Sequence, residues 1–209
     1  SQEDQSRFDS VHDLVDDVRL HGYYGGVRLG KATIKTFVEY CRAREVPLHD
    51  RNFAVRYTSN IPRAVGLAGS SAIIVATLRA LMEFYGVEIP CRVQPSLALA
   101  VETGELGITA GLQDRVIQVY GGVAAMEFGH ERVECCEGFD CGEYRRLNPA
   151  QLPRLYVAYS TDAGEPTEVF HNRLRERYDD GEPEVLAAMD RFAELTTEGV
   201  EALAEGDAE

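Results

Sequence analysis

The stretch Asn60-Ile-Pro-Arg-Ala-Val-Gly-Leu-Ala-Gly-Ser-Ser-Ala72 decides which fold and which chemistry can be expected of this chain. It is a loop rich in glycine and serine that runs directly into a long apolar segment, residues 70–85, which we expect to be a buried helix. Gly66 and Gly69 allow the backbone to approach an anion closely, and the free N–H groups at the start of the helix point toward that anion. The stretch therefore predicts a phosphate site. An ordinary loop with Ser70 as the N-cap of the helix is the alternative.

Two common nucleotide-binding motifs do not match this loop. The Gly-Lys-Ser/Thr of a Walker A loop is absent, and so is the G-x-G-x-x-G of the dinucleotide-binding fold. A phosphate site here must belong to another class of protein.

The composition excludes several classes of partner. The chain has 209 residues and a formal net charge of −14. Nucleic acids and anionic membranes bind basic surfaces, so this charge argues against both. We see no apolar run near the ~18 residues of a transmembrane span. The five cysteines include no CxxC pair, which indicates reduced thiols and a cytoplasmic protein.

Hydrophobic periodicity predicts a mixture of helices and strands. Some helical spacing is also present within residues 1–20, and residues 129–150 are irregular with short strand candidates. We expect helices at residues 31–43, 70–85, 94–102, 112–120, 167–178 and 183–204, and strands at residues 53–58, 123–128 and 154–160, of which the last is expected to be buried.

Two carboxylates follow the loop at positions that suit catalysis. Glu102 lies near the end of one predicted helix, and Asp114 lies in the first turn of the next. Magnesium binds carboxylate and hydroxyl oxygens together with substrate phosphates, so Glu102 and Ser71 are candidate metal ligands. Phosphoryl transfer needs a group that accepts the proton of the attacking alcohol, which Asp114 can do while Arg115 balances its charge. Each carboxylate taken alone is more typical of a solvated helix residue.

These residues carry a family resemblance. Pro62-x-x-x-Gly66-Leu-Ala-Gly-Ser-Ser-Ala72 resembles the second motif of the GHMP kinases, in which a Pro-x-x-x-Gly-Leu-Gly-Ser-Ser-Ala loop wraps the phosphates of ATP. The spacing from Glu102 to Asp114, followed by Gly121-Gly122, is also similar to that family, where the glutamate binds magnesium and the aspartate is the base.

The resemblance implies the fold and the site. The fold would be the α+β GHMP kinase fold, with a ribosomal-protein-S5-like N-terminal half and a ferredoxin-like C-terminal half. Asp114 would be catalytic, Ser71 and Glu102 would hold Mg²⁺, and Ser70 would contact phosphate. The residues expected to bind ATP are Pro62, Gly66, Leu67, Ala68, Gly69, Ser70, Ser71 and Ala72.

The substrate expected from the resemblance is a sugar or a sugar acid. The extra Ala68 in the loop, Tyr23-Tyr24-Gly-Gly upstream and Gly-Leu-Gln-Asp114-Arg resemble the glucuronokinase branch, which phosphorylates the anomeric hydroxyl of glucuronic acid. Candidate partners for the sugar carboxylate are Arg28, Arg63 and Arg115. Tyr23 and Tyr24 are either pocket residues or core and rim aromatics.

Two domains and several alternatives follow. Residues 1–150 would be the ATP-binding domain and residues 151–209 the start of the C-terminal domain, with the family's first motif expected ahead of Ser1 and its third beyond Glu209. Other acceptors of this family, namely a heptose phosphate, a galactose-like sugar or mevalonate, stay open. So does a protein that binds nucleotide and sugar without catalysis.

Overall fold

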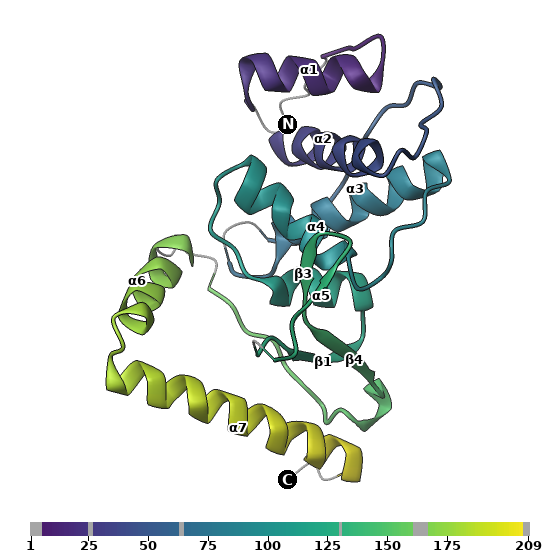
Figure 1. The fold of residues 1–209 in the computed structure, drawn as a ribbon. Helices are drawn as coiled ribbons and strands as arrows, with labels where there is room; N and C mark the ends of the chain where they lie inside the picture. The colour runs from purple at the N-terminus through teal and green to yellow at the C-terminus, as the bar shows by residue number, and fades with distance from the viewer. Residues whose placement is uncertain (1–5, 25–26, 63–64, 130, 161–166, 207–209) are drawn as a thin grey trace.

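The structure is a computed structural model that describes residues 6–24, 27–62, 65–129, 131–160 and 167–206. Figure 1 shows helices α1, α2 and α3 at one end of the molecule, α4 and α5 with two small two-stranded sheets in the middle, and α6 and α7 at the other end. The mixture of helices and antiparallel strands confirms the α+β class.

The first three helices contribute most of the larger core cluster. They are α1 (Val11–His21), α2 (Arg28–Ala43) and α3 (Gly69–Tyr85). Helix α2 buries Ile34, Phe37, Val38 and Cys41, the i, i+3, i+4, i+7 stripe that the periodicity predicts. The ring of Phe37 stacks on Tyr85 of α3 at 5.7 Å between centroids, so α2 and α3 are fixed against each other.

The next elements are short and surround the predicted carboxylates. Helix α4 (Gln94–Ala100) continues into a π-helical turn, η1 (Val101–Glu105), and α5 (Leu112–Tyr120) follows after a loop. The prediction for residues 112–120 is confirmed, and Gly121, with a φ of 66°, ends that helix. The π-helical turn was not predicted, and it replaces the end of the helix expected at residues 94–102.

Two antiparallel pairs of strands complete the body, and the second of them is a hairpin. Strand β1 (Val123–Glu127) pairs with β4 (Glu143–Leu147), with Val123 opposite Leu147. Strand β2 (Glu134–Cys136) pairs with β3 (Phe139–Cys141). Ser96 of α4 donates to the carbonyl of Asp140 at 2.7 Å and thereby fastens this hairpin to α4.

Two predicted strands are wrong. Residues 53–58 and residues 154–160 are not in strands, and the second segment is exposed rather than buried, with Leu155, Tyr156 and Val157 exposed by 66%, 83% and 76%. Apolar residues indicate which side of a strand would be buried, but a strand forms only when a neighbouring strand accepts and donates its backbone hydrogen bonds. Neither segment lies in a sheet in the described part of the chain.

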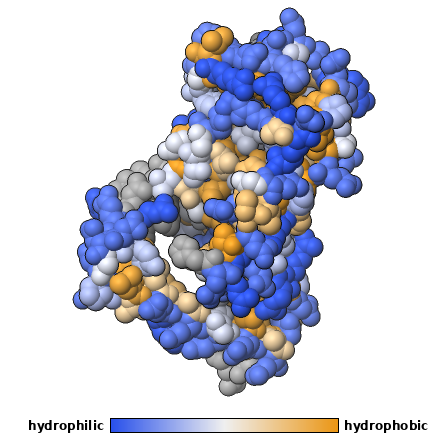
Figure 2. Space-filling model, in the orientation of Figure 1, coloured by the Kyte–Doolittle hydropathy of each residue, from blue (hydrophilic) through white to orange (hydrophobic). Residues whose placement is uncertain are grey.

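The last elements stand apart from the body. A short 3₁₀ turn, η2 (Pro149–Gln151), precedes the exposed segment, and helices α6 (Thr167–Asp179) and α7 (Pro183–Glu205) follow it close to their predicted bounds. Figure 2 shows these two helices projecting from the body with a mostly hydrophilic surface. Among the described residues, no helix combines the length and the apolar character that crossing a membrane requires.

Candidate active site

The glycine-serine loop leads into the N-terminal end of helix α3, where the first backbone N–H groups have no hydrogen-bond acceptor within the helix. Helix α3 begins at Gly69, and its first backbone hydrogen bond runs from Ala72 N to Ala68 O at 3.1 Å. The N–H groups of Gly69, Ser70 and Ser71 therefore have no intrahelical acceptor. The N-cap is Ala68, and no side chain caps the helix, so the alternative in which Ser70 is the cap is wrong. These donors are available to an anion.

The loop reaches this position through two left-handed residues. Gly66 has a φ of 73°, and Ala68 has a φ of 54° and a ψ of 33°. Left-handed backbone is costly for alanine, because its Cβ approaches the following carbonyl oxygen. The residue that distinguishes this loop from the shorter motif of the family is therefore held in a strained conformation.

Ser71 connects the loop to the buried interior. Its side chain is fully buried, and its Oγ donates to Ala68 O at 2.9 Å. One turn further along α3, Ile74 and Val75 belong to the smaller core cluster, which also contains Val101. Val101 directly precedes Glu102, so this cluster brings the start of α3 and the first predicted carboxylate to the same part of the molecule.

Glu102 is buried and paired. It lies in the π-helical turn η1 with 2% exposure. Arg115 Nε donates to its Oε2 at 2.8 Å, and Nη2 of the same guanidinium also contacts Oε2. Arg115 itself is 4% exposed, which makes this an ion pair removed from water.

Asp114 lies on the other side of the same guanidinium. Its Oδ2 is 3.4 Å from Arg115 Nη1, and its side chain is 53% exposed. Arg115 Nη1 also donates to the carbonyl of Gly111, the residue that precedes α5, at 2.8 Å. One arginine therefore joins the two predicted carboxylates, one facing inward and one accessible to a substrate.

The remaining predicted site residues are less buried or have other partners than predicted. Pro62, Leu67 and Ala72 are half-buried around the loop, and Ser71 makes its hydrogen bond to Ala68 rather than to Glu102. Of the candidate arginines for the sugar carboxylate, Arg63 lies outside the described residues. Arg115 is committed to Glu102, whereas Arg28 is exposed at the start of α2.

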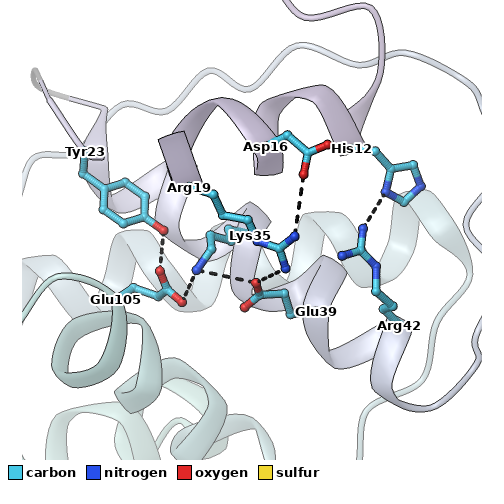
Figure 3. Close-up of polar contacts among 8 residues, drawn as sticks. All are labelled: His12, Asp16, Arg19, Tyr23, Lys35, Glu39, Arg42 and Glu105. Carbon is cyan, nitrogen blue, oxygen red and sulfur yellow. Dashed lines mark hydrogen bonds and ion pairs between the residues drawn. The ribbon is translucent and has the colours of Figure 1, made fainter. Parts of the chain in front are cut away.

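The two tyrosines behave differently from each other. Tyr23 Oη donates to Glu105 Oε2 at 2.6 Å, as Figure 3 shows, and it packs against the smaller core cluster. Tyr24 is 51% exposed, and Lys31 Nζ lies 4.5 Å from the centroid of its ring. Tyr23 is thus a partly buried structural residue in this structure, and only Tyr24 is open to solvent.

A hollow of about 340 Å³ lies elsewhere, at the end of α5 away from Asp114. It is lined by Arg92, Arg132 and carboxylates, but Arg92 is already paired with Glu134 at 2.5 Å and Arg132 with Glu143 at 3.3 Å. Among the described residues that line this hollow, an anionic substrate finds no uncompensated positive charge.

Sequence reasoning missed two parts of the site. The first is the pairing of Arg115 with Glu102, which are 13 positions apart and meet only through folding. The second is the π-helical turn that carries Glu102. Arg115 next to Asp114 was a visible signal for the first. Nothing in the local pattern indicates the second.

Comparisons with known proteins agree with the geometry. Residues 31–122 match the model of the family described as GHMP kinases N terminal domain. Glucuronokinase 1 of Arabidopsis thaliana is 40% identical over 206 residues, which are 98% of this chain and 56% of that protein. Probable glucuronokinase 2 of the same plant is 42% identical over 207 residues, 98% of this chain and 55% of that protein.

The names of more distant relatives indicate other phosphate acceptors. Mevalonate kinase of Thermococcus gammatolerans is 25% identical over 185 residues, 88% of this chain and 51% of that protein. No solved structure matches this chain significantly. The chain spans about half the length of the curated relatives that it matches.

Proposed function

We propose that residues 31–122, which match the model of the GHMP kinases N terminal domain, form a domain of that family, and that the protein is an ATP-dependent sugar kinase. It transfers the γ-phosphate of ATP to a sugar hydroxyl, and the acceptor is the anomeric hydroxyl of glucuronic acid. The similarity to the two Arabidopsis thaliana glucuronokinases over 98% of this chain supports that acceptor.

The observation that carries the proposal is the position of Glu102 and Asp114 on one guanidinium. Asp114, being 53% exposed, accepts the proton of the acceptor hydroxyl. The hydroxyl oxygen then forms a bond to the γ-phosphorus, the bond to the bridging oxygen of ADP breaks, and ADP leaves. Arg115 keeps Asp114 beside the buried Glu102 while this happens.

The start of α3 binds the phosphates in this proposal. The N–H groups of Gly69, Ser70 and Ser71 donate to phosphate oxygens, and the partial positive charge of the helix N-terminus adds to the attraction. The other loop residues from Pro62 to Ala72 shape the cradle. A local device of this kind is needed, because the chain as a whole has a net charge of −14 and repels an anion.

The residues present also fit magnesium. Mg²⁺ takes one or two carboxylates, substrate phosphates and waters. Ser71 Oγ donates a hydrogen bond to Ala68 O, which leaves the lone pairs of Oγ for a cation. Arg115 occupies Oε2 of Glu102, while Oε1 has no hydrogen bond among the described residues. Ser71 and Glu102 would hold the ion. When bound, Mg²⁺ neutralises charge that develops on the transferred phosphate.

We also propose the domain division and the location. Residues 1–150 are the ATP-binding domain, and residues 151–209 begin a second, ferredoxin-like domain. The exposed apolar side chains of residues 155–157 and the projecting α6 and α7 support a change of domain here. The five cysteines are free thiols, which supports a reducing, cytoplasmic location.

A coupled assay of ADP release tests the function. The full-length protein is offered ATP and Mg²⁺ with glucuronic acid, galacturonic acid, neutral sugars and mevalonate in turn. We expect turnover with glucuronic acid at the highest kcat/KM. Turnover with another acceptor would reassign the substrate, and ATP binding without turnover on any acceptor would show a sensor rather than an enzyme.

A further inference from the structure

The π-helical turn η1 carries two carboxylates that leave it in different directions. Glu102 is buried against Arg115, whereas Glu105, three residues later, has a side chain that is 20% exposed and contacts α2. A π-helical turn is rare and is frequently found at functional sites. A π-helical turn rotates less per residue than the about 100° of a regular α-helix, so a return to α-helical register would change the directions of Glu102 and Glu105 relative to each other.

Glu105 is held by two partners from outside the turn. Tyr23 Oη donates to Oε2 at 2.6 Å, and Lys35 Nζ of α2 donates to Oε1 at 2.5 Å (Figure 3). Both carboxylate oxygens are therefore engaged. Burial, reinforced by the hydrogen bond to Glu105, raises the pKa of Tyr23 well above its ordinary value, so Tyr23 remains a hydrogen-bond donor.

A row of side chains with alternating charge extends from Lys35 to helix α1. Lys35 Nζ is 3.5 Å from Glu39, which accepts from Arg19 of α1 at 2.8 Å, and Arg19 lies 3.6 Å from Asp16. Figure 3 shows this row of side chains crossing from η1 over α2 to α1. Glu105 is the member of the row that lies on the turn.

The backbone of the turn is fixed on its other side. Ile108 N donates to Glu102 O at 2.8 Å and closes the loop that leads toward α5. The amide of Ile108 therefore reports on the register of the turn at Glu102 itself.

We propose that Glu105 is a positioning residue which, through Tyr23 and Lys35, holds the π-helical turn in the register that directs Glu102 toward Arg115. This inference rests on the proposed function, in which Glu102 is the carboxylate for magnesium. Glu105 touches neither substrate nor metal. It acts through the backbone of residues 102–105.

The test compares Glu105→Ala with Glu39→Ala in the full-length protein. Both variants remove a carboxylate that binds Lys35, but Glu39 lies on α2 and not on the turn. The first measurement is amide hydrogen exchange at Ile108 by NMR, without metal. The second is the Mg²⁺ concentration that gives half-maximal ADP release.

We expect Glu105→Ala to speed exchange at Ile108 and to raise the Mg²⁺ requirement, each about tenfold, as expected for the loss of a charge-assisted hydrogen bond. Glu39→Ala should change neither. Tyr23→Phe removes only the hydrogen bond to Oε2 of Glu105. It should change the exchange rate and the Mg²⁺ requirement in the same direction but by less, and it replaces Glu105→Ala in the test if that variant does not fold. Equal exchange rates in Glu105→Ala and Glu39→Ala would overturn the inference, as would unchanged rates in Tyr23→Phe where only that variant folds.

Glu102→Gln separates this inference from the proposed function. If that variant leaves the Mg²⁺ requirement unchanged, Glu102 is not the metal carboxylate and that part of the proposed function fails. Exchange at Ile108 in Glu105→Ala still decides whether Glu105 holds the turn.

Discussion

Arg115 donates to Glu102 through both Nε and Nη2, and the two side chains are 5% and 2% exposed. Burying a charged side chain is costly unless such a partner is present. Because Arg115 also contacts Gly111 and Asp114, this pair fixes the distance between the π-helical turn and the start of α5. The relation between the two predicted carboxylates depends on it.

Arg115→Met is therefore expected to destabilise the fold. Removing one partner of a buried ion pair leaves the other charge uncompensated and costs about 3–5 kcal/mol. Urea denaturation should show this loss in the free energy of unfolding. The matched control is Arg132→Met, because Arg132 and its partner Glu143 are 59% and 58% exposed. If both variants unfold at the same urea concentration, the buried pair does not hold the site together.

Asp114→Asn should separate catalysis from binding. The side chain is 53% exposed and makes only a 3.4 Å contact with Arg115, so the fold and the affinity for ATP should not change. Loss of a general base lowers turnover by about 10²- to 10⁴-fold. Steady-state kinetics should show a lower kcat with an unchanged KM for ATP. An unchanged kcat would remove Asp114 from the role of base.

The loop before α3 offers a pair of substitutions with different outcomes. Gly66 has a φ of 73° and open space where a Cβ would lie, so Gly66→Ala should cost about 1 kcal/mol through backbone strain alone. In Ala68→Gly, relief of about 1–2 kcal/mol of left-handed strain offsets the ~0.5–1 kcal/mol entropy cost of glycine.

Thermal denaturation measures both variants. We expect a lower melting temperature for Gly66→Ala, and an unchanged or slightly higher one for Ala68→Gly. The reverse order would mean that the left-handed conformations of this loop are not those of the folded protein in solution.

Arg28 is our candidate for the carboxylate of the substrate. It is exposed at the start of α2, and its neighbour Leu29 packs against the same core cluster as Val101. Arg28→Met should raise the KM for glucuronic acid about ten- to a hundredfold, as expected when a hydrogen bond to a charged group is lost. The KM for ATP is the internal control. An unchanged KM for glucuronic acid would assign the carboxylate to another residue.

The parts of the fold that depend on local pattern were predicted well. The stripe of α2 and the bounds of α5 depend on periodicity and on end signals such as Gly121, all within one stretch of sequence. Residues 53–58 and 154–160 were predicted as strands from the same kind of pattern and are not strands, because pairing requires a neighbouring strand that local sequence does not specify.

The candidate site shows the same division. The loop, Glu102 and Asp114 were proposed as site residues from residue type, spacing and the family resemblance. The commitment of Arg115 to Glu102, and the contact of Tyr23 with Glu105 across 82 positions, arise from packing between elements and could not be predicted from the sequence. Both involve buried or partly buried charges whose partners are decided only when the chain is folded.

The most direct test of the kinase proposal is ³¹P NMR of the products formed by the full-length protein from ATP, Mg²⁺ and glucuronic acid. We predict ADP together with a sugar phosphate whose phosphorus couples to the anomeric proton, and no such product from the Asp114→Asn variant within the same time. Phosphate on another oxygen, an equal yield from Asp114→Asn, or ATP that stays intact with every acceptor would contradict the proposal.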